Sequence, residues 1–297
     1  MDGDPISAEV LAVVVALVDG EPCVLTLDDP PRVPAGPLLP GHRSLQAATR
    51  TWVEAQTGRQ LGYLEQLYTF ADVDRAERPG RRLSIGYLGL TTPGRTGLGG
   101  WRPWYDLLPW EDRRTGAARS PAAGLRTWAE SDATLAPVRR QRCATAFGLD
   151  GEPWQPELAL QRYELLYEAG LVPESPDAWR RPEGELAPGT RMLGDHRRVL
   201  ATGVARLRAK IQYRPVIFEL LPDEFTLREL QDCVEALAGR AVHTQNFRRL
   251  VEQQDLVEET GGLADTGGRP ARLYQFRRAV LLERQVAGTK LPAGRVR

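Results

Sequence analysis

The segment TLRELQDCVEALAGRAVHTQNFRRLV, residues 226–251, is the most informative stretch of the 297-residue chain. Thr226 and Glu229 have the spacing of a capping box, which predicts the start of a helix. Apolar residues then recur at helical spacing until Gly239, and Thr244 can cap a second helix shortly afterwards. Two short helices joined by a tight turn that contains glycine are typical of a helix-turn-helix.

The second helix of this pair carries side chains that suit the base edges of DNA. With Phe247, Leu250 and Val251 assigned to its inner face, the residues expected at DNA are Thr244, Gln245, Asn246, Arg248 and Arg249. Arginine pairs with guanine, and glutamine and asparagine pair with adenine. Polar helix faces are most often only solvated, and such a helix pair can also bind protein, so both alternatives stay open.

A β-hairpin wing is predicted after the helix pair. Leu256–Glu259 and Ala271–Phe276 are strand-like, and the glycine-rich stretch between them carries Arg269. We expect Arg269 and Arg272 to bind DNA, either at phosphates or in the minor groove. Residues 195–297 contain 18 basic and 13 acidic side chains in a chain of zero formal net charge, an uneven split that is typical of a nucleic-acid-binding end.

The first 110 residues have an α+β pattern. Strands are predicted at 11–18, 23–27, 63–70 and 83–90, with a hairpin turn at Asp19-Gly20 and a helix from Ser44 to Gly58. The proline-rich stretch 28–40 is predicted to lack regular structure.

One long amphipathic helix is predicted from Asp195 to Tyr213. Its apolar stripe is either core or a seam against another subunit, and its basic residues are expected to be solvated. The stripe is Leu200, Val204, Leu207 and Ile211; the basic residues are Arg197, Arg198, Arg206, Arg208 and Lys210. The predicted domains are 1–110, a helical connector at 111–194, and 195–297, with the Pro- and Gly-rich stretch Ser175–Thr190 as the best candidate for a boundary.

The chain resembles Nudix-related transcriptional repressors of NAD biosynthesis, in a longer bacterial branch with an extra segment between the two domains. The resemblance rests on Tyr213–Gln231, Asn246–Arg249 and Gly268–Arg272 in the C-terminal third, and on Glu65–Phe70, Arg82–Tyr87, Asp195-His196 and Arg206–Lys210 before it. It implies an N-terminal Nudix-like α/β/α sandwich, a helical connector and a C-terminal winged helix-turn-helix. It also implies operator DNA as a partner and ADP-ribose or a related adenine nucleotide as effector.

The catalytic Nudix motif is degenerate. Anchored on Gly58, the positions for the metal-binding glutamates hold Trp52, Ala55 and Gln56, and the earlier glutamate position holds Arg43. Mg²⁺ requires oxygen ligands, chiefly carboxylates, so we expect no metal, no cofactor and no hydrolysis by this helix. The alternative is a Nudix hydrolase that uses displaced carboxylates such as Glu65 or Glu77.

Four residues are candidates for nucleotide binding: Arg43, Phe70, Arg75 and Arg82. A guanidinium at a former carboxylate position could replace the metal charge and bind phosphate. Surface or core roles for all four remain alternatives.

Composition excludes several classes of protein. Hydrophobic residues make up 42% and charged residues 26%, which is typical of a globular chain. The three cysteines are far apart, which excludes a disulfide framework and a CxxC metal site, and no apolar run is long enough to span a membrane. We therefore expect a cytoplasmic protein, and a homodimer because helix-turn-helix proteins meet palindromic half-sites with two-fold symmetry.

Overall fold

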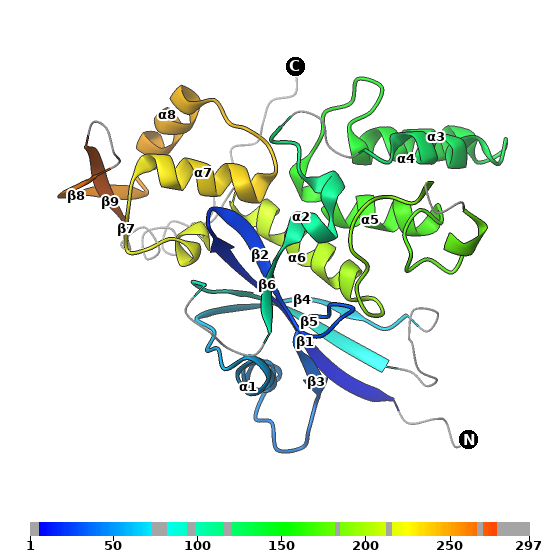
Figure 1. Cartoon of the computed structure of the whole chain (residues 1–297), viewed down its shortest axis with the longest axis horizontal. Coiled ribbons are helices and arrows are strands. Elements are labelled where there is room, and N and C mark those ends of the chain that lie inside the picture. The colour runs from blue at the N-terminus through cyan, green and yellow to red at the C-terminus, as the bar shows by residue number, and fades with distance from the viewer. Residues whose placement is uncertain are drawn as a thin grey trace. The chain divides into compact units, whose positions relative to one another are not determined.

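A computed structural model describes residues 6–72, 82–93, 99–115, 120–181, 185–211, 216–265 and 270–277 (Figure 1). The chain divides into two compact units. The first comprises residues 1–220 with 233–241, and the second comprises residues 221–232 with 242–297.

The first unit is built on a mixed six-stranded sheet. Its strands are β1 (Ser7–Val18), β2 (Glu21–Thr26), β3 (Ala35–Pro37), β4 (Tyr63–Phe70), β5 (Arg82–Leu90) and β6 (Gly100–Pro103). The order is β4-β5-β1-β2-β6, with β3 also paired to β1. β1 and β5 are parallel and every other pair is antiparallel.

Strand β1 lies at the centre of the sheet and is buried on both faces. Its residues Ala12 and Val14 share a core cluster with Val53 of helix α1 (Leu45–Thr57). On the opposite face, Gly203 of helix α6 (His196–Ile211) approaches Val13 so closely that a Cβ would lie 2.9 Å from its side chain. Figure 1 shows α1 and α6 on opposite faces, which confirms the α/β/α sandwich.

Local signals in the sequence explain the ends of several elements. Asp19 and Gly20 have φ values of 50° and 79°, as a two-residue hairpin turn requires. The Ser44 hydroxyl accepts from the Ala47 amide at 3.1 Å and caps α1. The prediction of no regular structure at 28–40 is wrong at one point, because the short segment Ala35–Pro37 forms strand β3 and pairs with β1.

The connector is helical, as predicted. Its helices are α3 (Ala122–Glu130), α4 (Ala136–Phe147) and α5 (Ala159–Glu168), with short 3-10 turns η2 (Pro156–Leu158) and η3 (Ala178–Arg180). Helix α2 (Trp104–Leu107) and the 3-10 turn η1 (Pro109–Glu111) lead into it from β6. Within the described ranges, none of the helices is long and apolar enough to cross a membrane.

The apolar stripe of helix α6 takes the first of its two predicted roles, since Leu200, Val204 and Leu207 are buried in the first unit and form core rather than a subunit seam. The prediction for the basic residues of the helix is wrong at two positions. Arg197 and Arg208, expected to be solvated, are 0% exposed. Because α6 packs on α5 and the sheet, it falls in the first unit, and the division of the chain lies at residue 221 rather than at 195 or within 175–190.

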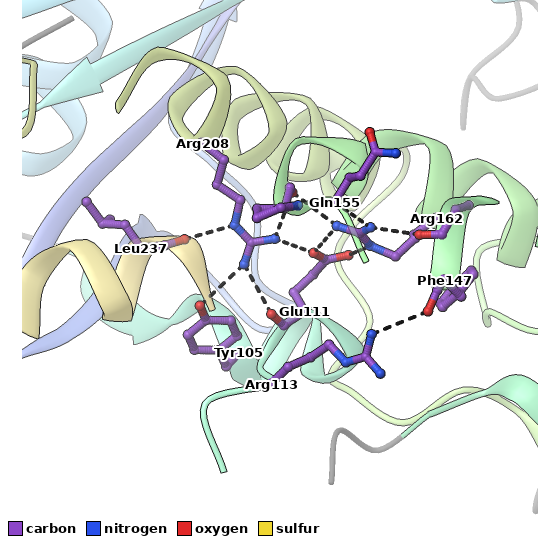
Figure 2. Close-up of polar contacts among 10 residues, drawn as sticks. Tyr105, Glu111, Arg113, Phe147, Gln155, Arg162, Arg208 and Leu237 are labelled. Carbon is purple, nitrogen blue, oxygen red and sulfur yellow. Dashed lines mark hydrogen bonds and ion pairs between the residues drawn. The ribbon is translucent and has the colours of Figure 1, made fainter. Parts of the chain in front are cut away.

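A buried ion cluster joins the connector to α6 (Figure 2). The Glu111 carboxylate accepts from Arg162 Nε at 2.6 Å and from Arg162 Nη2 at 2.8 Å, and its second oxygen also pairs with Arg208. All three side chains are at most 1% exposed. Burial acts to raise the pKa of Glu111, but the guanidinium groups of Arg162 and Arg208 hold that pKa below its ordinary value.

Two guanidinium groups against one carboxylate leave an excess positive charge, which main-chain carbonyls compensate. Arg162 donates to the carbonyls of Ala146 and Gln155 at 2.8 and 2.9 Å, and Arg208 donates to that of Leu237 at 2.8 Å. Ala146 and Leu237 lie in the last turns of α4 and of α7 (Leu227–Ala238), where helix carbonyls lack partners and carry partial negative charge. The cluster therefore stabilises two helix ends.

The second unit is a winged helix. It contains β7 (Glu224–Phe225), the first part of α7, α8 (Thr244–Gln254), β8 (Val257–Ala264) and β9 (Ala271–Phe276), and the sheet order is β7-β9-β8. The capping box is confirmed in both directions, since the Glu229 amide donates to Thr226 Oγ1 at 3.1 Å and the Thr226 amide donates to Glu229 Oε2 at 2.7 Å. Strand β8 extends past Glu259 into the stretch expected to be loop.

Glu111→Gln is expected to lower the free energy of unfolding by about 3–5 kcal/mol, because two buried guanidinium groups lose the carboxylate that they share. Urea titration followed by tryptophan fluorescence measures this change. The control is Glu130→Gln, which removes the exposed ion pair to Arg140 and should change stability little. Equal, small effects of both substitutions would contradict a stabilising role for the cluster.

Candidate functional site

The degenerate Nudix positions on α1 have taken structural roles. The side-chain amide of Gln56 makes two hydrogen bonds to the main chain of Ala35. Its Nε2 donates to the Ala35 carbonyl at 2.8 Å, and its Oε1 accepts from the Ala35 N–H at 3.1 Å. Trp52 donates to the Pro37 carbonyl at 3.0 Å, and its indole covers Gly36, where a Cβ would lie 2.3 Å from the ring. Two former metal positions therefore hold strand β3 against the helix.

These positions do not fit a magnesium ion. Mg²⁺ prefers carboxylate and water oxygens in octahedral geometry. Trp52 and Ala55 offer no oxygen, and the Gln56 oxygen is already bound to the Ala35 amide. Glu54, in the variable position, accepts from Gln60 at 3.0 Å. The donor set of this helix supports no metal-assisted step.

A cavity of about 510 Å³ lies on the sheet beside β3, within the usual range for a small-molecule pocket. Its wall is formed by the starts of β1 and β5, by β3, by the end of β4 and by the start of α6. The polar and aromatic groups in this wall are Ser7, Glu9, Arg32, Phe70, Asp72, Arg82, Ser84, Asp195 and His196.

Two arginines give this cavity its cationic groups. Arg32 Nε pairs with Asp28 at 2.5 Å, and Arg82 Nη1 pairs with Glu9 at 3.3 Å. Glu9 also accepts from the Ser84 hydroxyl at 2.6 Å. Over the part of the chain that the structure describes, each of these ion pairs uses one guanidinium nitrogen, which leaves further N–H donors for an anionic ligand.

His196 is a neutral donor in the same wall. Its Nδ1 accepts from the Val33 amide at 3.2 Å, which leaves the proton on Nε2. Burial, and then the charges of Arg32 and Arg82, lower the pKa of His196 to about 4. The imidazole is therefore uncharged at neutral pH.

The structure brings together only part of the predicted nucleotide set. Phe70 and Arg82 line the cavity, whereas Arg43 is exposed in the loop before α1 and is absent from the wall. Arg75 lies outside the described residues. Sequence reasoning missed Arg32 and assigned no role to His196, although Asp195-His196 was part of the family resemblance.

Helix α8 exposes the side chains expected to read bases. Gln245, Asn246, Arg248 and Arg249 are all exposed, while Phe247 and Val251 are buried. The inward assignment of Leu250 is wrong: its side chain is 51% exposed because it lies on the outer side of the helix.

Thr244 begins α8 but does not cap it. The capping position is His243, which makes no side-chain capping bond. The Thr244 hydroxyl instead accepts from Gln231 Nε2 at 3.2 Å, because α7 supplies a closer donor. Thr244 itself is exposed.

The second unit carries less net positive charge than the sequence predicted for residues 195–297. Arg272 is 68% exposed and pairs with Glu259 at 2.7 Å, and Arg269 lies outside the described residues. Counted over residues 221–232 and 242–297, the second unit has 11 basic and 10 acidic side chains. Most of the excess predicted for 195–297 belongs to α6 in the first unit, and five of the 11 basic residues of the second unit lie after residue 277.

Comparison with known sequences supports the assignment of the second unit as a winged helix. Residues 217–276 match the family model of the NrtR DNA-binding winged helix domain. A relative from Acinetobacter baylyi, named ADPR responsive transcriptional repressor NtrR, is 39% identical over 82 residues, which are 28% of this chain and 33% of that protein. The matching segment thus spans a third of the relative's length.

Comparison with solved structures agrees with the fold of the whole chain. The crystal structure of Shewanella oneidensis NrtR is similar with a TM-score of 0.53 and 22% identity, over 91% of this chain and 94% of that one. A MutT/nudix family protein from Enterococcus faecalis has a TM-score of 0.53 and 15% identity, over 93% and 88% of the two chains. The predicted C-terminal winged helix is confirmed by the family model, and the predicted Nudix-like fold before it is confirmed by the similarity to these solved structures.

Proposed function

We propose that this protein is a DNA-binding transcriptional repressor of NAD biosynthesis genes that senses ADP-ribose or a related adenine nucleotide. One observation carries the proposal: a single chain joins a Nudix fold without carboxylates at its metal positions to a winged helix of the NrtR type. The relative named as an ADPR responsive repressor supports both the DNA and the effector.

The cavity in the first unit is the proposed effector site. Arg32 and Arg82 suit a diphosphate, and the carboxylate of Asp195 suits ribose hydroxyl groups. Phe70, also in the wall, offers an aromatic surface to a base. Arg43 and Arg75 remain candidates from the sequence.

The outer face of α8 is the proposed DNA-reading surface, with Gln245, Asn246, Arg248 and Arg249 toward bases. Thr244, Arg269 and Arg272 are the proposed phosphate contacts. A helix-turn-helix dimer meets half-sites about 34 Å apart, so we propose a homodimer. Leu200, Val204 and Leu207 are buried in their own chain, so these residues are not the proposed dimer surface.

Hydrolysis is not part of the proposal. Besides the degenerate α1 positions, the candidate displaced base Glu65 is held by Lys210 and Tyr63. Burial acts to raise the pKa of Glu65, but these partners lower it, so the group is a poor proton acceptor. The other candidate, Glu77, lies outside the described residues.

Arg82→Ala is expected to weaken ADP-ribose binding about tenfold or more, because a charged hydrogen bond to the diphosphate is lost. Isothermal titration calorimetry measures the Kd. The control is Arg126→Ala, because the Arg126 side chain is exposed and is not among the residues of the cavity wall. Arg43→Ala should have a smaller effect. The reverse order, with Arg43 dominant, would place the nucleotide at α1 and contradict the cavity assignment.

Arg248→Ala or Arg249→Ala is expected to cost about 1–3 kcal/mol at a guanine contact and to relax specificity at that base. Arg272→Ala should weaken binding to all duplexes alike and reduce the salt slope by about one. Fluorescence anisotropy on operator and scrambled duplexes at several salt concentrations separates these effects. Wild-type binding by all three variants would remove the assignment of this surface.

We expect no Mg²⁺-dependent cleavage of ADP-ribose or NADH by the purified protein, since α1 lacks the carboxylates that hold the metal. Product release is followed by chromatography, beside an active Nudix hydrolase as positive control. Turnover that depends on Mg²⁺ and survives further purification would favour the hydrolase alternative.

A further inference from the structure

Helix α6 extends from the cavity to the end of α7. Asp195, His196 and Val199, at its start, line the cavity. Arg208, near its other end, donates to the Leu237 carbonyl in the last turn of α7. At 1.5 Å per residue, about 18 Å of helix separates His196 from Arg208.

Arg198 ties the start of α6 to the cavity wall. Its Nη1 donates to Asp72 at 2.6 Å and to Asp195 at 3.2 Å, and its guanidinium lies 5.2 Å from the ring centre of Phe70. Phe70, Asp72 and Asp195 all line the cavity. A ligand that contacts this wall therefore competes for the groups that hold Arg198 in place.

The middle of α6 crosses the sheet at Gly203. With only a hydrogen at this position, the helix backbone contacts Val13 of β1 directly, and a Cβ would lie 2.9 Å from that side chain. This contact fixes the middle of a stiff helix. If the start of α6 moves, the helix tilts about Gly203 and its other end moves as well.

The far end of α6 and its neighbours hold the last carbonyls of α7 (Figure 2). Arg208 Nε donates to Leu237 at 2.8 Å, the Tyr105 hydroxyl donates to Ala236 at 2.6 Å, and Arg208 Nη2 donates to that hydroxyl at 3.3 Å. At Gly239, with φ of +71°, a Cβ would lie 2.3 Å from the Glu111 carbonyl. The end of α7 is thus fitted closely to α6 and η1.

Helix α7 belongs to both units. Its residues 233–238 lie in the first unit, and its residues 227–232 lie in the second. Because the helix is continuous, a shift of its last turn is carried along the backbone into the winged helix.

We infer that α6 couples the effector cavity to the winged helix, with Arg208 and Tyr105 as positioning residues that transmit its tilt to the last turn of α7. The inference rests on the proposed function, and it adds the path by which occupancy of the cavity changes DNA binding. Allosteric coupling factors are commonly about 5–150-fold, and the loss of one hydrogen bond changes an equilibrium by about 2–10-fold. The loss of one bond at the end of α7 is therefore large enough to be measured against such a coupling factor.

The test is a thermodynamic cycle on the full-length chain with Tyr105→Phe. The Kd for operator duplex is measured with and without saturating ADP-ribose, and the ratio of the two values is the coupling factor. We expect Tyr105→Phe to move this ratio toward one by about threefold or more. The Kd of the free protein for ADP-ribose should stay within about twofold of wild type, since Tyr105 is not in the cavity wall.

Tyr87→Phe is the matched control, because Tyr87 is also buried in the first unit but lies in the cluster under α1. Arg208→Lys is a second variant, which keeps the charge and loses the forked hydrogen bonds; circular dichroism checks its fold. A coupling factor changed no more by Tyr105→Phe than by Tyr87→Phe would overturn the inference and leave the proposed function standing. A wild-type ratio of one with ADP-ribose, with ATP and with NAD would overturn both.

Discussion

The buried carboxylate of Glu111 is the interaction on which the first unit depends. It lies between the guanidinium groups of Arg162 and Arg208, and those groups in turn donate to carbonyls at the ends of α4 and α7. An ion pair removed from water is favourable only when its remaining donors are satisfied. Here main-chain carbonyls and the Tyr105 hydroxyl accept the remaining hydrogen bonds. The same cluster therefore pairs the buried charges and provides donors for carbonyls at two helix ends.

Side chains at the metal-binding positions of the Nudix motif make structural contacts in this protein. Trp52 and Gln56 stand where the motif has metal-binding glutamates, and both hold β3 to α1. This exchange keeps the strand that borders the cavity in position without a metal ion. The cavity wall is built mainly from β1, β3, β5 and the start of α6 rather than from the motif helix, so its shape does not depend on carboxylates at the motif positions.

Local signals were sufficient to predict most elements, and tertiary contacts explain what was missed. The capping box at Thr226, the turn at Asp19-Gly20 and the cap at Ser44 are encoded by neighbouring residues, and each is present. The burial of Arg197 and Arg208 depends on partners about a hundred residues away in sequence, among them Leu107 and Glu111, so periodicity alone indicated a solvated face. The cavity residue Arg32 was missed for the same reason, since it lies in a loop without a motif.

The near balance of charge in the second unit has a consequence for how such a protein searches a chromosome. Attraction to random duplex comes mainly from counterions that basic side chains displace from the phosphates. Over residues 221–232 and 242–277 the second unit has six basic and nine acidic side chains, and the other five basic side chains lie after residue 277. In the proposed role, adsorption to bulk DNA would therefore depend on that last segment and on the exposed arginines of α8, so that non-specific and operator binding would draw on different parts of the chain.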